Sequence, residues 1–140
     1  MTSVLIRTMT IGDYDDVLSL WQSSEGIGLS DADSRDNLSR FLERNEGLSK
    51  VAMEGSKLVG ALLCGHDGRR GYIHHLTVTG KFRGKGTGQT LVKSSLEELS
   101  KAGIQKCHLF VFSENQDARA FWRQINWTER SELIMMSKYS

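Results

Sequence analysis

Residues 81–92 read KFRGKGTGQTLV, which places three glycines and three cations directly before an apolar, helix-like segment. The run before it, GYIHHLTVTG at residues 71–80, predicts a strand bounded by glycine at both ends. From Gly86 the apolar positions recur at helical spacing as far as Ala102, and Gly103 is a natural C-terminal stop. The loop therefore joins a strand to a helix, and its main-chain N–H groups lie at the helix N-terminus.

This loop has the chemistry of an anion site. Unpaired N–H groups and the helix dipole favour an anion, the glycines allow close approach, and Arg83 and Lys85 add charge. We expect a pyrophosphate group there, and the alternative is a solvated turn whose cations face water. A Walker loop is excluded because no G-K-[ST] occurs. A dinucleotide-binding fingerprint is disfavoured because five residues separate Val78 from Gly84.

The rest of the chain predicts one mixed α/β domain over residues 1–140, since 140 residues with 39% hydrophobic content suffice for one core. The expected order is β-α-α-β-β-β-α-β-α-β, with a strand–helix–strand crossover over residues 72–112. The expected strands cover residues 4–9, 50–54, 57–65, 71–80, 104–112 and 127–138. One expected helix begins after residue 10, and the others cover residues 35–44, 86–102 and 114–127.

Composition limits the function. A net charge of +1 argues against a nucleic-acid partner. The first apolar run is broken by Arg7 and soon followed by aspartates, which fits neither a signal peptide nor a membrane span, so we expect a cytoplasmic protein. Cys64 and Cys107 lie in strand-like runs without C-x-x-C spacing, so they are expected to be buried and reduced. Neighbouring Cys and His residues lack ligand spacing, so no metal is expected.

Three segments resemble the GCN5-related N-acetyltransferase (GNAT) superfamily. RGKGTG at residues 83–88 resembles its R/Q-x-x-G-x-G/A pyrophosphate loop. IHHLTV and the later ENQDARAFWRQINW, at residues 114–127, stand where the family has its acetyl-CoA strand and its N-x-x-A-x-x-[FL]-[YW] helix. The element order matches along nearly the whole chain, and residues 72–127 look most like small bacterial members. The resemblance implies a mostly antiparallel mixed sheet with helices on both faces and a splayed pair of central strands.

The resemblance also implies acetyl-CoA as co-substrate and a direct transfer of acetyl to a primary amine while both substrates are bound. The main chain of the fourth strand would pair with the pantetheine arm and supply the donor for the oxyanion. The acceptor would be a small-molecule or peptide amine, and the protein a monomer or homodimer. The expected acetyl-CoA-binding residues are Leu76, Thr77, Val78, Arg83, Gly84, Lys85, Gly86, Thr87, Gly88, Asn115 and Trp122.

A base is needed to deprotonate the amine, and the candidates are His74 and Tyr72. They lie two apart on the strand and so share a face, whereas His75 is expected on the other face. Tyr72 stands where GCN5-type enzymes keep a glutamate, and the serotonin N-acetyltransferase branch has histidines at the positions of Tyr72 and His74. We expect His74 to act through water; a satisfied strand histidine is the alternative.

The sequence departs from the family in two places. Trp122 stands where many members keep a tyrosine that protonates the leaving thiolate, and indole is no acid. A non-catalytic acyl-CoA-binding sensor or partner-binding module is therefore the second hypothesis. Phe110 replaces a glutamate of the ribosomal-protein acetyltransferases. The acceptor end is expected near the segment 25–33, with candidates Trp21, Glu25, Ile27 and Leu29, although a solvated acidic loop is an equal alternative.

Overall fold

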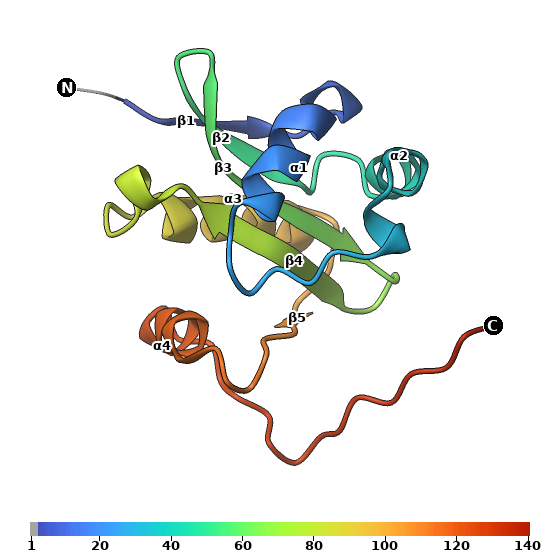
Figure 1. The fold of residues 1–140 in the computed structure, drawn as a ribbon. Coiled ribbons are helices and arrows are strands. Elements are labelled where there is room, and N and C mark those ends of the chain that lie inside the picture. The colour runs from blue at the N-terminus through green and yellow to red at the C-terminus, as the bar shows by residue number, and fades with distance from the viewer. Residues whose placement is uncertain (1–2) are drawn as a thin grey trace. The chain divides into compact units, whose positions relative to one another are not determined.

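The computed structural model describes residues 3–140 and divides the chain into two compact units, residues 1–110 and 111–140 (Figure 1). The first unit holds a five-stranded sheet in the order β1-β2-β3-β4-β5. The pairings are antiparallel except for the last, between β4 and β5, which is parallel. The strands are β1 Leu5–Thr8, β2 Lys50–Glu54, β3 Lys57–His66, β4 Gly71–Val78 and β5 Cys107–Leu109. The predicted mixed, mostly antiparallel sheet is therefore confirmed.

Helices cover both faces of this sheet (Figure 1). On one face lie α1 (Tyr14–Gln22) and α2 (Arg35–Arg44), and short 3-10 turns at Ile11–Asp13 and Asp31–Asp33 precede them. On the other face lies α3 (Thr87–Lys101), reached from β4 through a third such turn at Gly80–Phe82. None of the helices within residues 3–140 is long and apolar enough to cross a bilayer.

Each face has its own apolar core. Residues of α1, α2 and the strands bury one another on the first face, namely Met9, Val17, Leu20, Trp21, Leu38, Val51, Ala61 and Leu63. On the second face Leu91 and Leu99 of α3 are almost completely buried against the strands. Burial of such side chains is the main favourable term in folding, so the two layers together hold the sheet in place.

The strands β4 and β5 separate after three residue pairs. The pairs run from Gly71 with Cys107 to Ile73 with Leu109, and β5 ends there while β4 continues to Val78. From His74 onward, the edge of β4 that faces away from β3 has no strand partner among the described residues. This is the predicted splay of the central strands.

The strand β4 carries one extra residue. Between the pair Ala61–Thr77 and the pair Leu63–His74, β3 advances by two residues and β4 by three. The backbone of His75 lies in the left-handed region, with φ at 56°. A β-bulge of this kind bends the strand and redirects side chains and main-chain groups beside it.

The second unit holds α4, Gln116–Gln124, whose first turn is capped by the Asn115 side chain accepting from the Ala118 N–H at 3.1 Å. Asn126 follows the helix in the expected left-handed conformation, with φ at 74°. The predicted strand over residues 127–138 was wrong, because no strand forms there. Its side chains from residue 128 are exposed, and an apolar segment without a partner to complete the ladder does not become a strand.

Gly60 in β3 gives a test of the packing between sheet and α3. An added Cβ would lie 3.1 Å from Leu91 Cδ1, 3.3 Å from Ala52 Cβ and 3.3 Å from the Thr77 carbonyl oxygen. Because all three distances are shorter than ordinary van der Waals contact, we expect Gly60→Ala to lower the free energy of unfolding by about 1–3 kcal/mol in urea denaturation.

The matched control is Gly80→Ala, where an added Cβ meets nothing within 4 Å and φ is not positive. This variant should keep the wild-type urea midpoint within a few tenths of a kcal/mol or exceed it slightly. Equal midpoints for the two variants would contradict the close approach of α3 to β3.

Candidate active site

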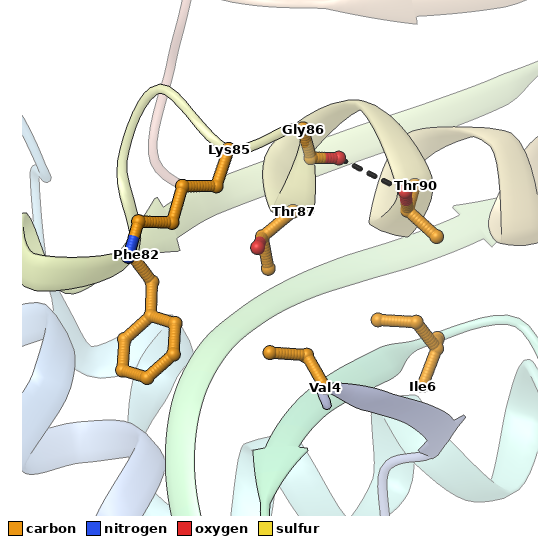
Figure 2. A pocket seen from close by; sticks show the side chains of 7 residues that line it. All are labelled: Val4, Ile6, Phe82, Lys85, Gly86, Thr87 and Thr90. Carbon is orange, nitrogen blue, oxygen red and sulfur yellow. Dashed lines mark hydrogen bonds between the residues drawn. The ribbon is translucent and has the colours of Figure 1, made fainter. Parts of the chain in front are cut away.

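The loop after β4 ends in a helix N-terminus with free donors. Gly84 and Gly86 take left-handed conformations, with φ at 74° and 83°, and Gly86 is the N-cap of α3. The first helical bond runs from the Thr90 N–H to the Gly86 carbonyl at 3.0 Å, and the Thr90 hydroxyl donates to the same carbonyl at 2.9 Å (Figure 2). The main-chain N–H groups of residues 84–89 find no acceptor within residues 3–140. Six adjacent donors are thus available to an anion.

The cations of this loop are held differently. Arg83 Nε donates to the Val78 carbonyl at 2.9 Å, which ties the loop to the end of β4. The terminal nitrogens of Arg83 make no hydrogen bond within the described residues and remain available for an anion. Lys85 Nζ lies 5.7 Å from the centre of the Phe82 ring, so its ammonium is oriented by a cation–π contact.

An open cavity of about 500 Å³ lies beside the same loop. Figure 2 shows the loop and the first turn of α3 on one side and the start of β1 on the other. It is lined by Val4, Ile6, Phe82, Lys85, Gly86, Thr87 and Thr90. Three of these residues, Lys85 to Thr87, are among those expected to bind the pyrophosphate.

The bulge in β4 is anchored by three hydrogen bonds. The His75 carbonyl accepts from the Trp21 indole N–H at 3.0 Å and from the Thr77 hydroxyl at 3.2 Å. His75 Nε2 lies 3.0 Å from Asp33 Oδ1, and the imidazole packs edge-on against the Trp21 ring at 5.0 Å. The prediction that His75 faces away from His74 was wrong, because the bulge turns His75 toward the layer of α1 and α2.

The acceptor-side candidates have different surroundings. Trp21 is buried in the core, and its indole N–H already donates to the His75 carbonyl. The side chain therefore fixes the main chain of β4. Ile27 and Leu29 are half-buried and pack against the same core, whereas Glu25 is exposed. The segment therefore exposes the Glu25 carboxylate to solvent, while Ile27 and Leu29 pack against the core.

A row of aromatic rings runs along the α1–α2 face of β4 and β5, and we call it the aromatic row. His74 lies 6.3 Å from Phe41 of α2 and 6.5 Å from Tyr72, to which it is nearly parallel. Tyr72 lies 6.3 Å from Phe110 and 5.7 Å from His108. Tyr72 and His74 thus share a face as predicted, and Phe110 at the end of the row is 60% exposed.

The electrostatics of His74 suit a base. Burial lowers the pKa of His74 below its usual 6.5, and the neighbouring His75 lowers the pKa further, while Asp33 opposes both effects. The imidazole therefore stays neutral to lower pH than a free histidine, and a neutral imidazole is the form that takes up a proton.

The two cysteines are free thiols; Cys64 is buried as predicted, whereas Cys107 is only half-buried. Burial raises the pKa of Cys64 to about 12 and that of Cys107 to about 11, so neither thiol forms a nucleophilic thiolate near neutral pH. Within residues 3–140 no group of three or more His, Cys, Asp or Glu side chains is arranged to hold a metal ion.

The second unit carries the other two candidates. The Asn115 side chain caps α4, so its oxygen is engaged with the helix. Trp122 is buried between Phe121 and Trp127, with ring centres 5.1 Å and 5.0 Å away. Its packing within this unit is thus that of a small apolar cluster.

Sequence reasoning missed the partnership of Asp33 with His75 and the place of Phe41 in the aromatic row. Asp33 and His75 are 42 residues apart, and no local pattern links them. The bulge does leave a sign in the sequence, because the consecutive polar residues His74 and His75 interrupt the alternation of apolar and polar residues along β4.

Several solved structures share this fold at low sequence identity. Ard1 from Thermoplasma volcanium superposes with a TM-score of 0.78 at 17% identity, covering 89% of this chain and 82% of that one. PaiA N-acetyltransferase from Thermoplasma acidophilum, solved in complex with coenzyme A, gives a TM-score of 0.76 at 20% identity, covering 88% of each chain.

Sequence relatives agree with the fold. An acetyltransferase of Sodalis glossinidius is 24% identical over 133 residues, and one of Pectobacterium atrosepticum is 27% identical over the same length. Each match covers 95% of this chain and 93% of the relative. The model of the Acetyltransferase (GNAT) family matches residues 14–127, which spans parts of both compact units. The chain therefore belongs to the acetyltransferase (GNAT) family.

Proposed function

We propose that this protein transfers the acetyl group of acetyl-CoA to a primary amine by direct attack while both substrates are bound. The observation that carries the proposal is the run of free N–H groups at residues 84–89, in the loop that follows a strand whose outer edge is open. Coenzyme A in the PaiA structure, which has the same fold, supports the choice of donor. The matched family model extends across most of the chain, so we infer one cytoplasmic N-acetyltransferase domain.

The donor would bind along β4 and the loop. The pyrophosphate oxygens accept hydrogen bonds from the main-chain N–H groups of residues 84–89 and from the side chains of Arg83 and Lys85. The pantetheine arm runs beside Leu76–Val78, where β4 lacks a strand partner on that edge. A main-chain N–H near the bulge then donates to the carbonyl oxygen of the thioester, where negative charge develops in the transition state.

The reaction is an acyl transfer. His74, through water, takes a proton from the ammonium form of the acceptor, and the free amine nitrogen attacks the thioester carbonyl carbon. The tetrahedral intermediate collapses with cleavage of the C–S bond, and the second amine proton is lost to solvent. CoA leaves as a thiolate, which takes a proton from Tyr72 or water, because Trp122 has no acidic proton to give.

The acceptor would lie against the aromatic row. Tyr72 and His74 are half-buried and Phe110 is mostly exposed, so the row offers flat apolar surface next to the proposed base. Such a surface favours an amine that carries an aromatic or apolar group, and the exposed Glu25 supplies a negative charge for its ammonium.

The alternative is an acyl-CoA-binding sensor without turnover, which the tryptophan at position 122 favours. Release of CoA thiol against a panel of primary amines separates the two. Turnover of any amine above the hydrolysis rate supports the enzyme, and acetyl-CoA binding without turnover of any amine supports the sensor.

The first functional prediction concerns the loop. Gly86→Asp and Gly86→Asn differ only in charge, and Asp and Asn both tolerate the left-handed backbone better than most residues. We expect the aspartate to weaken acetyl-CoA binding at least tenfold more than the asparagine, because it puts a negative charge at the helix N-terminus. Isothermal titration calorimetry measures both, and equal dissociation constants would contradict the pyrophosphate site.

The second prediction concerns His74. Since its pKa is lowered, activity should persist below pH 6.5 and fall as the pH drops through that lowered pKa. His74→Gln should remove this limb from the profile of kcat against pH and lower kcat about 100-fold, with acetyl-CoA KM little changed. His66→Gln, at the end of β3, is the control and should keep both the limb and the rate. An unaltered pH profile in His74→Gln would assign the proton to another group.

The third prediction concerns the aromatic row. Phe110→Ala should raise KM for 2-phenylethylamine roughly threefold to tenfold and leave KM for ethylamine unchanged, because only the former stacks on the ring. Leu5→Ala, which removes a similarly exposed apolar side chain from β1, serves as the control. An equal rise in KM for both amines in Phe110→Ala would show that the acceptor binds elsewhere.

A further inference from the structure

Asp33 joins three parts of the first unit. Its Oδ2 accepts from the Ser30 N–H at 3.1 Å, which closes the turn at the end of the segment 23–30. Its main-chain carbonyl accepts from the Tyr14 hydroxyl at 2.8 Å, which reaches it from α1. Its Oδ1 lies 3.0 Å from His75 Nε2 in the bulge of β4. The carboxylate is 9% exposed, so both of its oxygens are engaged in a nearly dry environment.

His75 is held in a conformation that its own backbone does not favour. A φ of 56° is uncommon for a residue with a Cβ, and the surroundings must fix it. Trp21 and Thr77 bind the carbonyl, and Asp33 binds the ring. Removal of the ring would leave the Asp33 carboxylate buried without its partner.

The pair lies between the two halves of the proposed site. His75 directly follows the proposed base His74 and directly precedes Leu76, where the proposed path of the pantetheine begins. Asp33 ends the segment that carries Glu25, Ile27 and Leu29. A single contact therefore connects the strand for the donor with the segment above the acceptor.

We propose that the Asp33–His75 pair is a positioning device that holds the acceptor-side segment in register with the bulge of β4. The inference rests on the proposed function, because the two halves are those of the acetyl transfer. Neither side chain needs to touch a substrate. The pair acts through the Ser30 turn on one side and through the main chain of residues 74–76 on the other.

The position of the pair predicts which constants change. Acetyl-CoA binds mainly through the loop at residues 83–89, which the pair does not contact, so its dissociation constant should stay within twofold. The geometry of attack and the acceptor-side segment both depend on the pair, so kcat should fall and the amine KM should rise. A pair that served stability alone would lower the melting temperature and leave both constants unchanged in the folded fraction.

The experiment uses four variants of the full chain. Asp33→Asn keeps the shape and removes the charge. His75→Gly removes the ring but suits the left-handed backbone, and His75→Gln keeps an N–H donor at similar reach. The fourth variant combines Asp33→Asn with His75→Gly. Steady-state kinetics with the best amine of the panel, acetyl-CoA calorimetry and hydrogen exchange of residues 25–33 are measured on each.

We expect Asp33→Asn and His75→Gly each to lower kcat/KM for the amine at least tenfold and to speed hydrogen exchange in residues 25–33. His75→Gln should recover most of the loss. The double variant should lose less than the product of the single losses, because neither partner is then left alone.

Besides an unchanged kcat and amine KM in the folded fraction, two results overturn the inference. The first is unchanged exchange of residues 25–33 in both single variants. The second is a loss of acetyl-CoA affinity as large as the change in amine KM. If no amine is turned over by the wild-type protein, the proposed function fails on its own, and hydrogen exchange with acetyl-CoA calorimetry still decides whether the pair orders the segment.

Discussion

The structure of the site depends on one extra residue in β4. Without it the strand would pair evenly with β3, and the main-chain groups of residues 74–77 would point alternately to β3 and to the opposite edge. The bulge turns the His75 carbonyl toward Trp21 and its imidazole toward Asp33. Trp21 belongs to the core under α1, so the bulge is fixed by the same packing that stabilises the fold. The proposed acyl site therefore takes its rigidity from the hydrophobic core.

The open edge of β4 results from the shortness of β5. Three residue pairs join the two strands, and the chain of β5 then leaves β4. Main-chain groups that a longer partner would use stay accessible along the second half of β4. The unpaired N–H and C=O groups of such an edge can form hydrogen bonds with another extended chain. In the proposed function the pantetheine arm takes that place.

Local chemistry made part of this architecture predictable. The glycines and cations of residues 81–88 and the helical period after them predicted the loop and α3, because a helix N-terminus is formed by neighbours in sequence. The face of His75 was predicted wrongly, because strict alternation assumes an unbroken pleat, whereas the two consecutive histidines mark the place where it is interrupted. The pairing with Asp33 depends on the tertiary fold, since the two residues come from different layers. The last strand was predicted from apolar composition at residues 127–138, but strand formation also requires a partner.

The bulge has a consequence for insertions and deletions in β4. A deletion of His75 would leave His74 opposite Leu63 and Thr77 opposite Ala61, so every remaining side chain of the strand would keep its present face. A deletion at Ile73 would instead move Tyr72 and Gly71 to the wrong faces and set a tyrosine against the buried layer of α3. The strand thus has one position at which its length can change without reversing the faces of its other side chains. At that position a shorter chain would keep the alternation of the strand but lose the kink, together with the contacts of His75 to Trp21 and Asp33.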